Sequence, residues 1–106
     1  MSVKVLGQSN PGAGVATDLY TVPSAKSTVC SSIVVCNRSS TATSFRIAVR
    51  PAGAAILNQH YIYYDTPILG NDTFVATIGI TLATTDVVTV YTAAATLSFN
   101  LFGDES

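Results

Sequence analysis

Residues 28–49 read TVCSSIVVCNRSSTATSFRIAV, and this stretch decides the fold. Its last part, FRIAV, has apolar side chains at every second position, which predicts a β-strand with one buried face. Its first part, CSSIVVC, has apolar side chains on both faces. That pattern indicates either a strand covered on both sides or a bend at Ser31-Ser32 that moves the strand from one layer to another. The intervening NRSST segment consists of turn formers, so we expect a hairpin whose apolar face is the floor of the core.

Further short segments alternate in the same way and are separated by Gly, Pro, Asn and Asp. No stretch shows helical periodicity. We therefore predict a single domain over residues 1–106 with an all-β fold, an antiparallel two-sheet β-sandwich of about eight strands, jelly-roll-like or Greek-key. A closed barrel is the alternative. The strands expected outside residues 28–49 are residues 2–8, 18–22, 59–65, 73–80, 87–92 and 96–102.

The connections between these segments carry expectations of their own. Residues 51–58 (PAGAAILN) are too short and Gly-containing for a stable helix, and we expect a loop that crosses the sandwich. The last two strands, residues 87–92 and 96–102, are expected to form a terminal hairpin. Residues 103–106 are expected to be a frayed acidic end. In the strand at residues 73–80, the side chains expected to point inward are Phe74, Ala76, Ile78 and Ile80.

Charged residues are scarce. They make up 10% of the chain and leave a net charge of −1, whereas an average soluble domain has about 25%. A surface with so few charges does not keep a monomer dispersed in solution. We therefore expect copies of the chain or a partner to cover much of this surface. The basic residues are scattered and form no stripe that follows phosphates, which argues against nucleic acid as a partner. No apolar run reaches the ~20 residues of a membrane-spanning helix, so we expect no membrane association.

Residues with reactive side chains are few and poorly placed for chemistry. His60 is the only histidine, and no nucleophile–base pair or metal-ligand spacing accompanies it. The aspartates lie in or beside turn signals, where they are expected to cap the backbone. We therefore expect no enzyme activity, no catalytic residues, no cofactor and no bound metal. Cys30 and Cys36 would lie ~20 Å apart on one strand, too far for a disulfide, so we expect free thiols.

Three tyrosines in one expected strand are the most distinctive side chains. Tyr61 and Tyr63 should lie on one face of that strand and Tyr64 on the other. Tyrosine is enriched at interfaces because it combines apolar area with a polar tip. We take these tyrosines, together with Arg46 and Arg50, as candidate interface residues. The alternative is that two of the tyrosines cap the core.

Several strings along the chain carry a family resemblance. They are DLYTVP, IVVCNR, FRIAVRPAGAA, YIYYDTPI, NDTF, GITLATTDVV and LSFNLFGDE, at residues 18–23, 33–38, 45–55, 61–68, 71–74, 79–88 and 97–105. With these strings the chain resembles, from Val3 to Glu105, a group of small virion structural proteins of tailed bacteriophages, many of them from phages of cyanobacteria and other aquatic bacteria.

The resemblance implies a β-rich, non-enzymatic protein that self-assembles, often as a trimer. It further implies a location in the virion after assembly in the host cytoplasm, with the major capsid protein or tail and neck proteins as partners. Capsid decoration (a cement protein) is the leading role, and a neck, tail, baseplate or fibre-attachment component is the alternative. A carbohydrate- or receptor-binding β module is a further alternative. The resemblance contributes no functional residues.

Phe45 and Phe99 are expected to be core aromatics. Their replacement by alanine should therefore lower the free energy of unfolding by about 3–5 kcal/mol each. Thermal or urea denaturation measures this loss. An unchanged melting temperature in both variants would contradict the core assignment.

Overall fold

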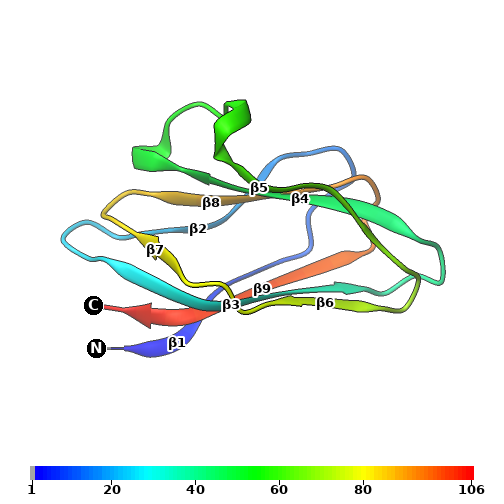
Figure 1. Ribbon diagram of the computed structural model, residues 1–106, viewed down its shortest axis with the longest axis horizontal. Coiled ribbons are helices and arrows are strands. Elements are labelled where there is room, and N and C mark those ends of the chain that lie inside the picture. Colours follow the sequence, from blue (N-terminus) through cyan, green and yellow to red (C-terminus); the bar gives the residue numbers. More distant parts are fainter. Residues whose placement is uncertain (1) are drawn as a thin grey trace.

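In the computed structural model, which describes residues 2–106, nine strands form two stacked antiparallel sheets (Figure 1). Sheet 1 contains, in spatial order, β1 (Val3–Ser9), β9 (Leu97–Glu105), β3 (Thr28–Asn37) and β6 (Thr73–Ala76), and β7 (Ile80–Leu82) also pairs with β3. Sheet 2 contains β2 (Thr17–Thr21), β8 (Val87–Thr92), β4 (Thr43–Arg50) and β5 (Tyr61–Ile68). Two 3-10 turns, η1 (Pro51–Gly53) and η2 (Asn58–His60), lie between β4 and β5. None of the described residues forms a helix long and apolar enough to cross a membrane.

The strand order is that of a jelly roll. β6 and β7 pair with successive parts of β3, so together they occupy one strand position. The eight positions then have the spatial orders 1-8-3-6 and 2-7-4-5, and most connections pass from one sheet to the other, as in a double-sheet jelly roll. The all-β, two-sheet sandwich expected from the sequence is confirmed.

The connectivity expected from the sequence is wrong in three places. β3 and β4 are not a hairpin, because β3 lies in sheet 1 and β4 in sheet 2. β8 and β9 are divided between the sheets in the same way. The segment between β4 and β5 does not cross the sandwich but joins neighbours in sheet 2. Alternation with a period of two predicts which face of a strand is buried, but not which strand lies beside it. Two buried faces can belong to neighbouring strands of one sheet or can meet across the core from opposite sheets.

A bulge in β3 explains its unusual pattern. The register with β9 shifts between Cys30 and Ser32. Because of the extra residue, Cys30 and Ile33 both point inward although they are three positions apart, and Val29 points outward with 51% of its surface exposed. The expected bend that moves the strand to another layer at Ser31-Ser32 is therefore wrong: the irregularity lies at this position, but it is a bulge that keeps β3 in its sheet.

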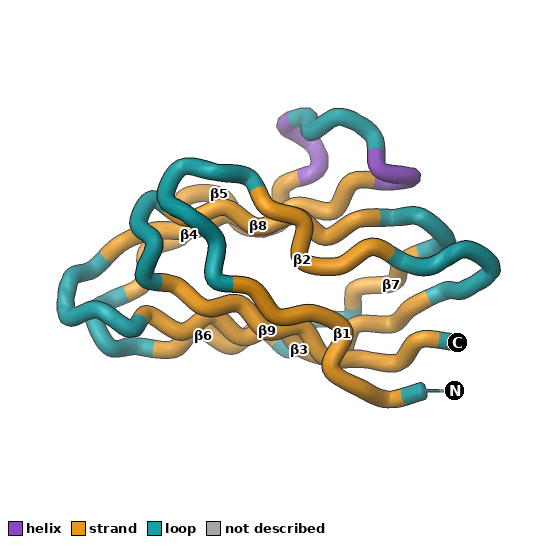
Figure 2. Tube along the Cα trace, turned by 180° about the vertical axis from the view of Figure 1, so that it is seen from behind, coloured by secondary structure: helices purple, strands orange, loops and turns teal. Residues whose placement is uncertain are grey.

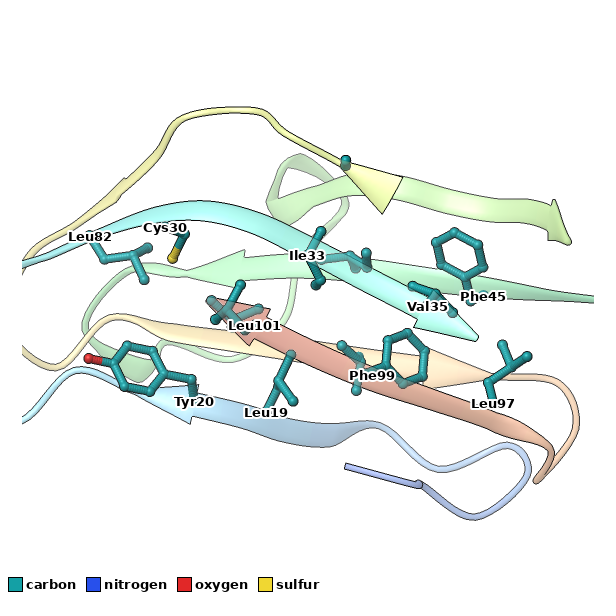
Figure 3. Packing of buried hydrophobic residues seen from close by; sticks show 14 of the residues in the cluster. Leu19, Tyr20, Cys30, Ile33, Val35, Phe45, Leu82, Leu97, Phe99 and Leu101 are labelled. Carbon is teal, nitrogen blue, oxygen red and sulfur yellow. The ribbon is translucent and has the colours of Figure 1, made fainter. Parts of the chain in front are cut away.

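The core lies between the two sheets (Figure 3). Phe45 of β4 and Phe99 of β9 meet across it edge to face, with ring centroids 6.2 Å apart, and both are fully buried. Their expected core position is confirmed. Ile78 was expected inside but is exposed, because pairing with β3 is interrupted at residues 77–79 between β6 and β7.

One end of the sandwich is organised by the buried side chain of Asn37. Its Nδ2 donates hydrogen bonds to the carbonyl oxygens of Thr41 (2.9 Å) and Leu69 (3.2 Å). Its Oδ1 accepts from the Ser39 amide and the Thr96 hydroxyl, each at 3.1 Å. A single amide therefore joins three connections: β3 to β4, β5 to β6 and β8 to β9.

The opposite end is closed by the C-terminal strand. Glu105 belongs to β9, accepts from the Lys4 ammonium (2.8 Å) and from the Tyr20 hydroxyl (2.6 Å), and so is not part of a frayed end. Lys4, followed by Tyr20, lowers the pKa of the Glu105 carboxyl. Burial, reinforced by the Glu105 carboxylate, raises the pKa of Tyr20 to about 12. Tyr20 comes from sheet 2, so these contacts tie the two sheets together.

Replacement of Asn37 by alanine should destabilise the fold by about 2–4 kcal/mol, because several buried partners lose their hydrogen bonds at once. The matched control is Asn100→Ala, which removes only the side-chain contact with Gln8 on the surface and should cost less than about 1 kcal/mol. Urea denaturation of both variants measures the difference. Equal losses would show that the Asn37 amide does not organise this end.

Candidate interaction surface

The first bulge in β5 separates two of its tyrosines. Tyr61 and Tyr63 pair with the adjacent β4 residues Ala48 and Ile47, so Ile62 is an extra residue in β5. Tyr63 faces inward beside Ile47, whereas Tyr61 faces outward with Ala48. The sequence-based expectation that Tyr61 and Tyr63 share a face is therefore wrong, because one inserted residue reverses the alternation.

Tyr64 faces outward because it directly follows the inward-facing Tyr63. It therefore lies on the same outer face as Tyr61, and it is 57% exposed. Between Tyr63 and Thr66, β5 again has one residue more than the facing stretch of β4. Asp65 lies at this second irregularity with a positive φ of 48°, a conformation uncommon for residues other than glycine.

Tyr63 belongs to the core. Its ring meets that of Phe74 edge to face at a centroid distance of 5.1 Å, and the ring of Phe45 is 6.4 Å away. Of the three tyrosines proposed as interface residues, the structure thus directs Tyr63 inward and leaves Tyr61 and Tyr64 accessible from outside.

Around Tyr64, the outer face of sheet 2 carries a tyrosine–arginine cluster, composed of Arg46, Tyr61, Tyr64, Asp65 and Tyr91. The Arg46 guanidinium lies over the rings of Tyr64 and Tyr91, 4.2 and 4.5 Å from their centroids. It also contacts both carboxylate oxygens of Asp65, at 2.6 and 3.4 Å, and this pair raises the pKa of Arg46. The rings of Tyr61 and Tyr64 meet edge to face at 4.9 Å. Sequence reasoning missed Tyr91, although it alternates with the buried residues Val88 and Val90 on β8.

A shallow hollow of about 440 Å³ adjoins this cluster and is lined by Asn58, Tyr61 and Tyr64. Asn58 belongs to the η2 turn and is exposed. The segment that contains both 3-10 turns projects from the outer side of sheet 2, away from sheet 1 (Figure 2). The hollow is therefore accessible at the outer surface of the sandwich.

Arg50 lies on the same outer face as Arg46 but is engaged within the chain. It donates to the Thr89 hydroxyl (2.9 Å), to the Asp18 carboxylate (2.8 Å) and to the carbonyl oxygens of Gly53 and Ala54 (3.1 and 3.0 Å). These bonds hold η1 against the sheet. The structure therefore gives Arg50 an intramolecular role, and its expected interface role stays a prediction.

The outer face of sheet 1 has a different chemistry. Apart from Asp104, the outward-facing side chains of its described strands are apolar or polar without charge. We call this surface the valine face, and its members are Val3, Val5, Gln8, Val29, Ser31, Ser32, Val34, Cys36, Thr73, Val75, Thr81, Ser98, Asn100, Phe102 and Asp104. In contrast, the outer face of sheet 2 carries two ion pairs, Arg46–Asp65 and Arg50–Asp18.

The residues with reactive side chains lie apart from one another or serve the backbone. His60 Nδ1 accepts the Leu57 amide at 3.0 Å and closes the η2 turn. Asp86 accepts the amides of Ala52 and Ala83, at 2.8 and 2.9 Å, and Asp72 accepts that of Thr73 at 2.8 Å, as expected for aspartates beside turns. The same expectation is wrong for Asp18 and Asp65, whose carboxylates pair with Arg50 and Arg46. Within residues 2–106, no group of three or more His, Cys, Asp or Glu side chains is positioned to hold a metal ion.

Both cysteines are free thiols, as expected. Cys30 is buried in the core, and this burial raises its pKa to about 11. Cys36 is half-buried on the valine face. The two thiols therefore differ in their accessibility to alkylating reagents.

No protein-family model matches the chain, and no curated protein or solved structure is significantly similar to it.

Proposed function

We propose that this chain is a non-enzymatic structural subunit of a bacteriophage particle and that it assembles with copies of itself through the valine face. The observation that carries the proposal is the near absence of charge on that face, together with several exposed valines. Exposed apolar surface of this extent is typical of interaction sites rather than of solvated surface. The assignment to a bacteriophage particle rests on the family resemblance described above.

The whole valine face, taken together, has about the size of one side of a standard interface. The strands run along the longest axis of the molecule, 41 Å, and the view in Figure 1 is down the shortest axis, 20 Å, with one sheet above the other. The footprint of each sheet face is therefore at most about 800 Å², the area that each partner contributes to an interface of standard size.

A second copy of the chain fits this face better than a charged partner does. Two copies of a nearly uncharged surface do not repel each other, and a charged partner would lose hydration without gaining an ion pair. Hydroxyl and amide side chains such as Ser32, Ser98 and Asn100 can form hydrogen bonds across the contact. The proposed assembly is a homo-oligomer. Contact of the valine face with the same face of a second copy closes as a dimer, whereas the trimer that the resemblance favours requires the valine face to meet a different surface of its neighbour.

Within the particle, capsid decoration is the role we favour. A decoration protein is present in many copies and needs complementary, weakly charged flanks. Jelly rolls also occur among viral capsid proteins, although this is an analogy of fold alone. A neck, tail, baseplate or fibre-attachment component has the same requirements and is the alternative role.

A second candidate function is a carbohydrate- or receptor-binding β module. It is favoured by the hollow between Asn58, Tyr61 and Tyr64, where aromatic rings lie open beside an amide. This function uses the outer face of sheet 2 and is compatible with assembly through sheet 1.

The double variant Val29→Lys/Val75→Lys places two positive charges on exposed positions of the valine face. We expect light scattering to give a mass of two or more chains for the unmodified protein and 11.0 kDa for the variant. Ile62→Lys, at an exposed site on β5 of sheet 2, is the control and should leave assembly intact. Cys36 should be protected from iodoacetamide in the assembled protein and react in the variant. A monomeric unmodified protein, or a variant that still assembles, would contradict assembly through this face.

The particle assignment can be tested by electron microscopy of purified phage particles labelled with gold-conjugated antibodies against this chain. Labelling spread over the capsid would support decoration, whereas labelling confined to one vertex or to the tail would support the alternative role. Particles that contain every other virion protein but show no labelling would contradict a structural role in the virion.

A further inference from the structure

We propose that the hollow formed by Asn58, Tyr61 and Tyr64 binds the ring of an uncharged sugar. This inference rests on the second candidate function above and specifies its ligand. The site lies on the outer side of sheet 2, opposite the valine face, and does not depend on self-assembly. It would hold a neutral glycan, such as one exposed on a cell surface or in the surrounding medium, at the outer surface of the subunit.

The local backbone is built to bring these side chains together. With regular alternation, Tyr61 and Tyr64 would lie on opposite faces of β5, because they are three positions apart. The extra residue at Ile62 places both rings on the outer face, and a second irregularity, at Asp65, follows Tyr64 directly. Bulges that redirect side chains are common beside binding and active sites. Non-glycine residues with a positive φ, such as Asp65, are likewise found more often at functional positions.

The aromatic wall of the hollow is held in place before any ligand arrives. The Arg46 guanidinium lies over the rings of Tyr64 and Tyr91, and its hydrogen bonds to Asp65 hold it there. Tyr61 supports Tyr64 edge to face at 4.9 Å. A side chain that is already ordered loses little conformational entropy when a ligand binds, so weakly interacting ligands benefit most from such an arrangement.

The lining matches the two kinds of surface on a sugar. A pyranose ring has an apolar C–H face that packs on aromatic rings and a rim of hydroxyl groups that need both donors and acceptors. Tyr61 and Tyr64 offer the aromatic surface, and the exposed Asn58 amide offers a donor and an acceptor together. A volume of about 440 Å³ lies within the range of small-molecule sites.

The electrostatics favour an uncharged ligand. The nearest cation, Arg46, is neutralised by its contacts with both carboxylate oxygens of Asp65. No charged side chain is among the three residues that line the hollow. A sialylated or sulfated glycan would therefore find no free positive charge.

A proline-rich peptide also packs on tyrosines, but its recognition requires an aromatic groove that follows an extended chain. Here all lining residues come from the short segment 58–64 and surround one compact hollow. The geometry therefore favours a single ring over an extended peptide.

The test is a printed array of neutral, sialylated and sulfated glycans, probed with the purified protein. We expect binding to at least one neutral glycan and at least tenfold weaker binding in Tyr64→Ala and in Asn58→Ala. Tyr64→Phe should retain most of the binding, because the ring is kept. Ile62→Ala is the matched control, since Ile62 lies on the same strand, is exposed and does not line the hollow.

Melting curves of each variant show whether weaker binding comes from loss of the site or from loss of the fold. Asn58 lies outside the tyrosine–arginine cluster, so Asn58→Ala tests the hollow even if Tyr64→Ala disturbs the cluster. The same array with the Val29→Lys/Val75→Lys variant separates sugar binding from assembly. The proposal is overturned if no neutral glycan binds, if only acidic glycans bind, or if binding persists in folded Tyr64→Ala and Asn58→Ala.

Discussion

The hydrogen bonds of the Asn37 amide are the constraint on which much of this fold depends. A jelly roll sends its chain from one sheet to the other at most connections, and each such connection carries backbone groups that need partners at the edge of the core. Asn37 has four hydrogen-bond partners on three connections, so it binds the ends of both sheets to each other. The close approach of these loops is also visible at Gly70, where any side chain would collide with the backbone of Ser40. At the opposite end, Tyr20 and Glu105 join the sheets in the same manner.

Single inserted residues determine which chemistry each face presents. In β3 the bulge before Ser32 turns Val29 outward and Cys30 inward. In β5 the extra residue at Ile62 brings Tyr61 and Tyr64 to the outer face and leaves Tyr63 in the core. Without these insertions, the valine face would lose an exposed valine and the tyrosine–arginine cluster would be divided between the two sides of β5.

The two outer faces are chemically distinct, and this asymmetry motivates both proposals. Sheet 1 presents a nearly uncharged surface suited to contact with copies of the chain, whereas sheet 2 carries the paired arginines and the exposed tyrosines. A subunit organised in this way can contact its neighbours with one face and leave the other accessible. The chain contains few charges, and those of sheet 2 are mostly used in pairs within the sheet.

The sequence by itself determined the all-β class, the approximate strands, the burial of Phe45 and Phe99, the backbone-capping role of Asp86 and the free state of both thiols. These properties are local, because alternation and turn residues report the exposure of each strand face within a few positions. The tertiary structure was needed to show that β3 and β4 lie in different sheets, that Tyr61 accompanies Tyr64 rather than Tyr63, and that two ion pairs lie on the outer face of sheet 2. Strand pairing joins residues that lie far apart in the chain. A bulge reverses which face of the sheet every later side chain of the strand points to, without any change in the types of residue present. Local periodicity therefore contains no record of either.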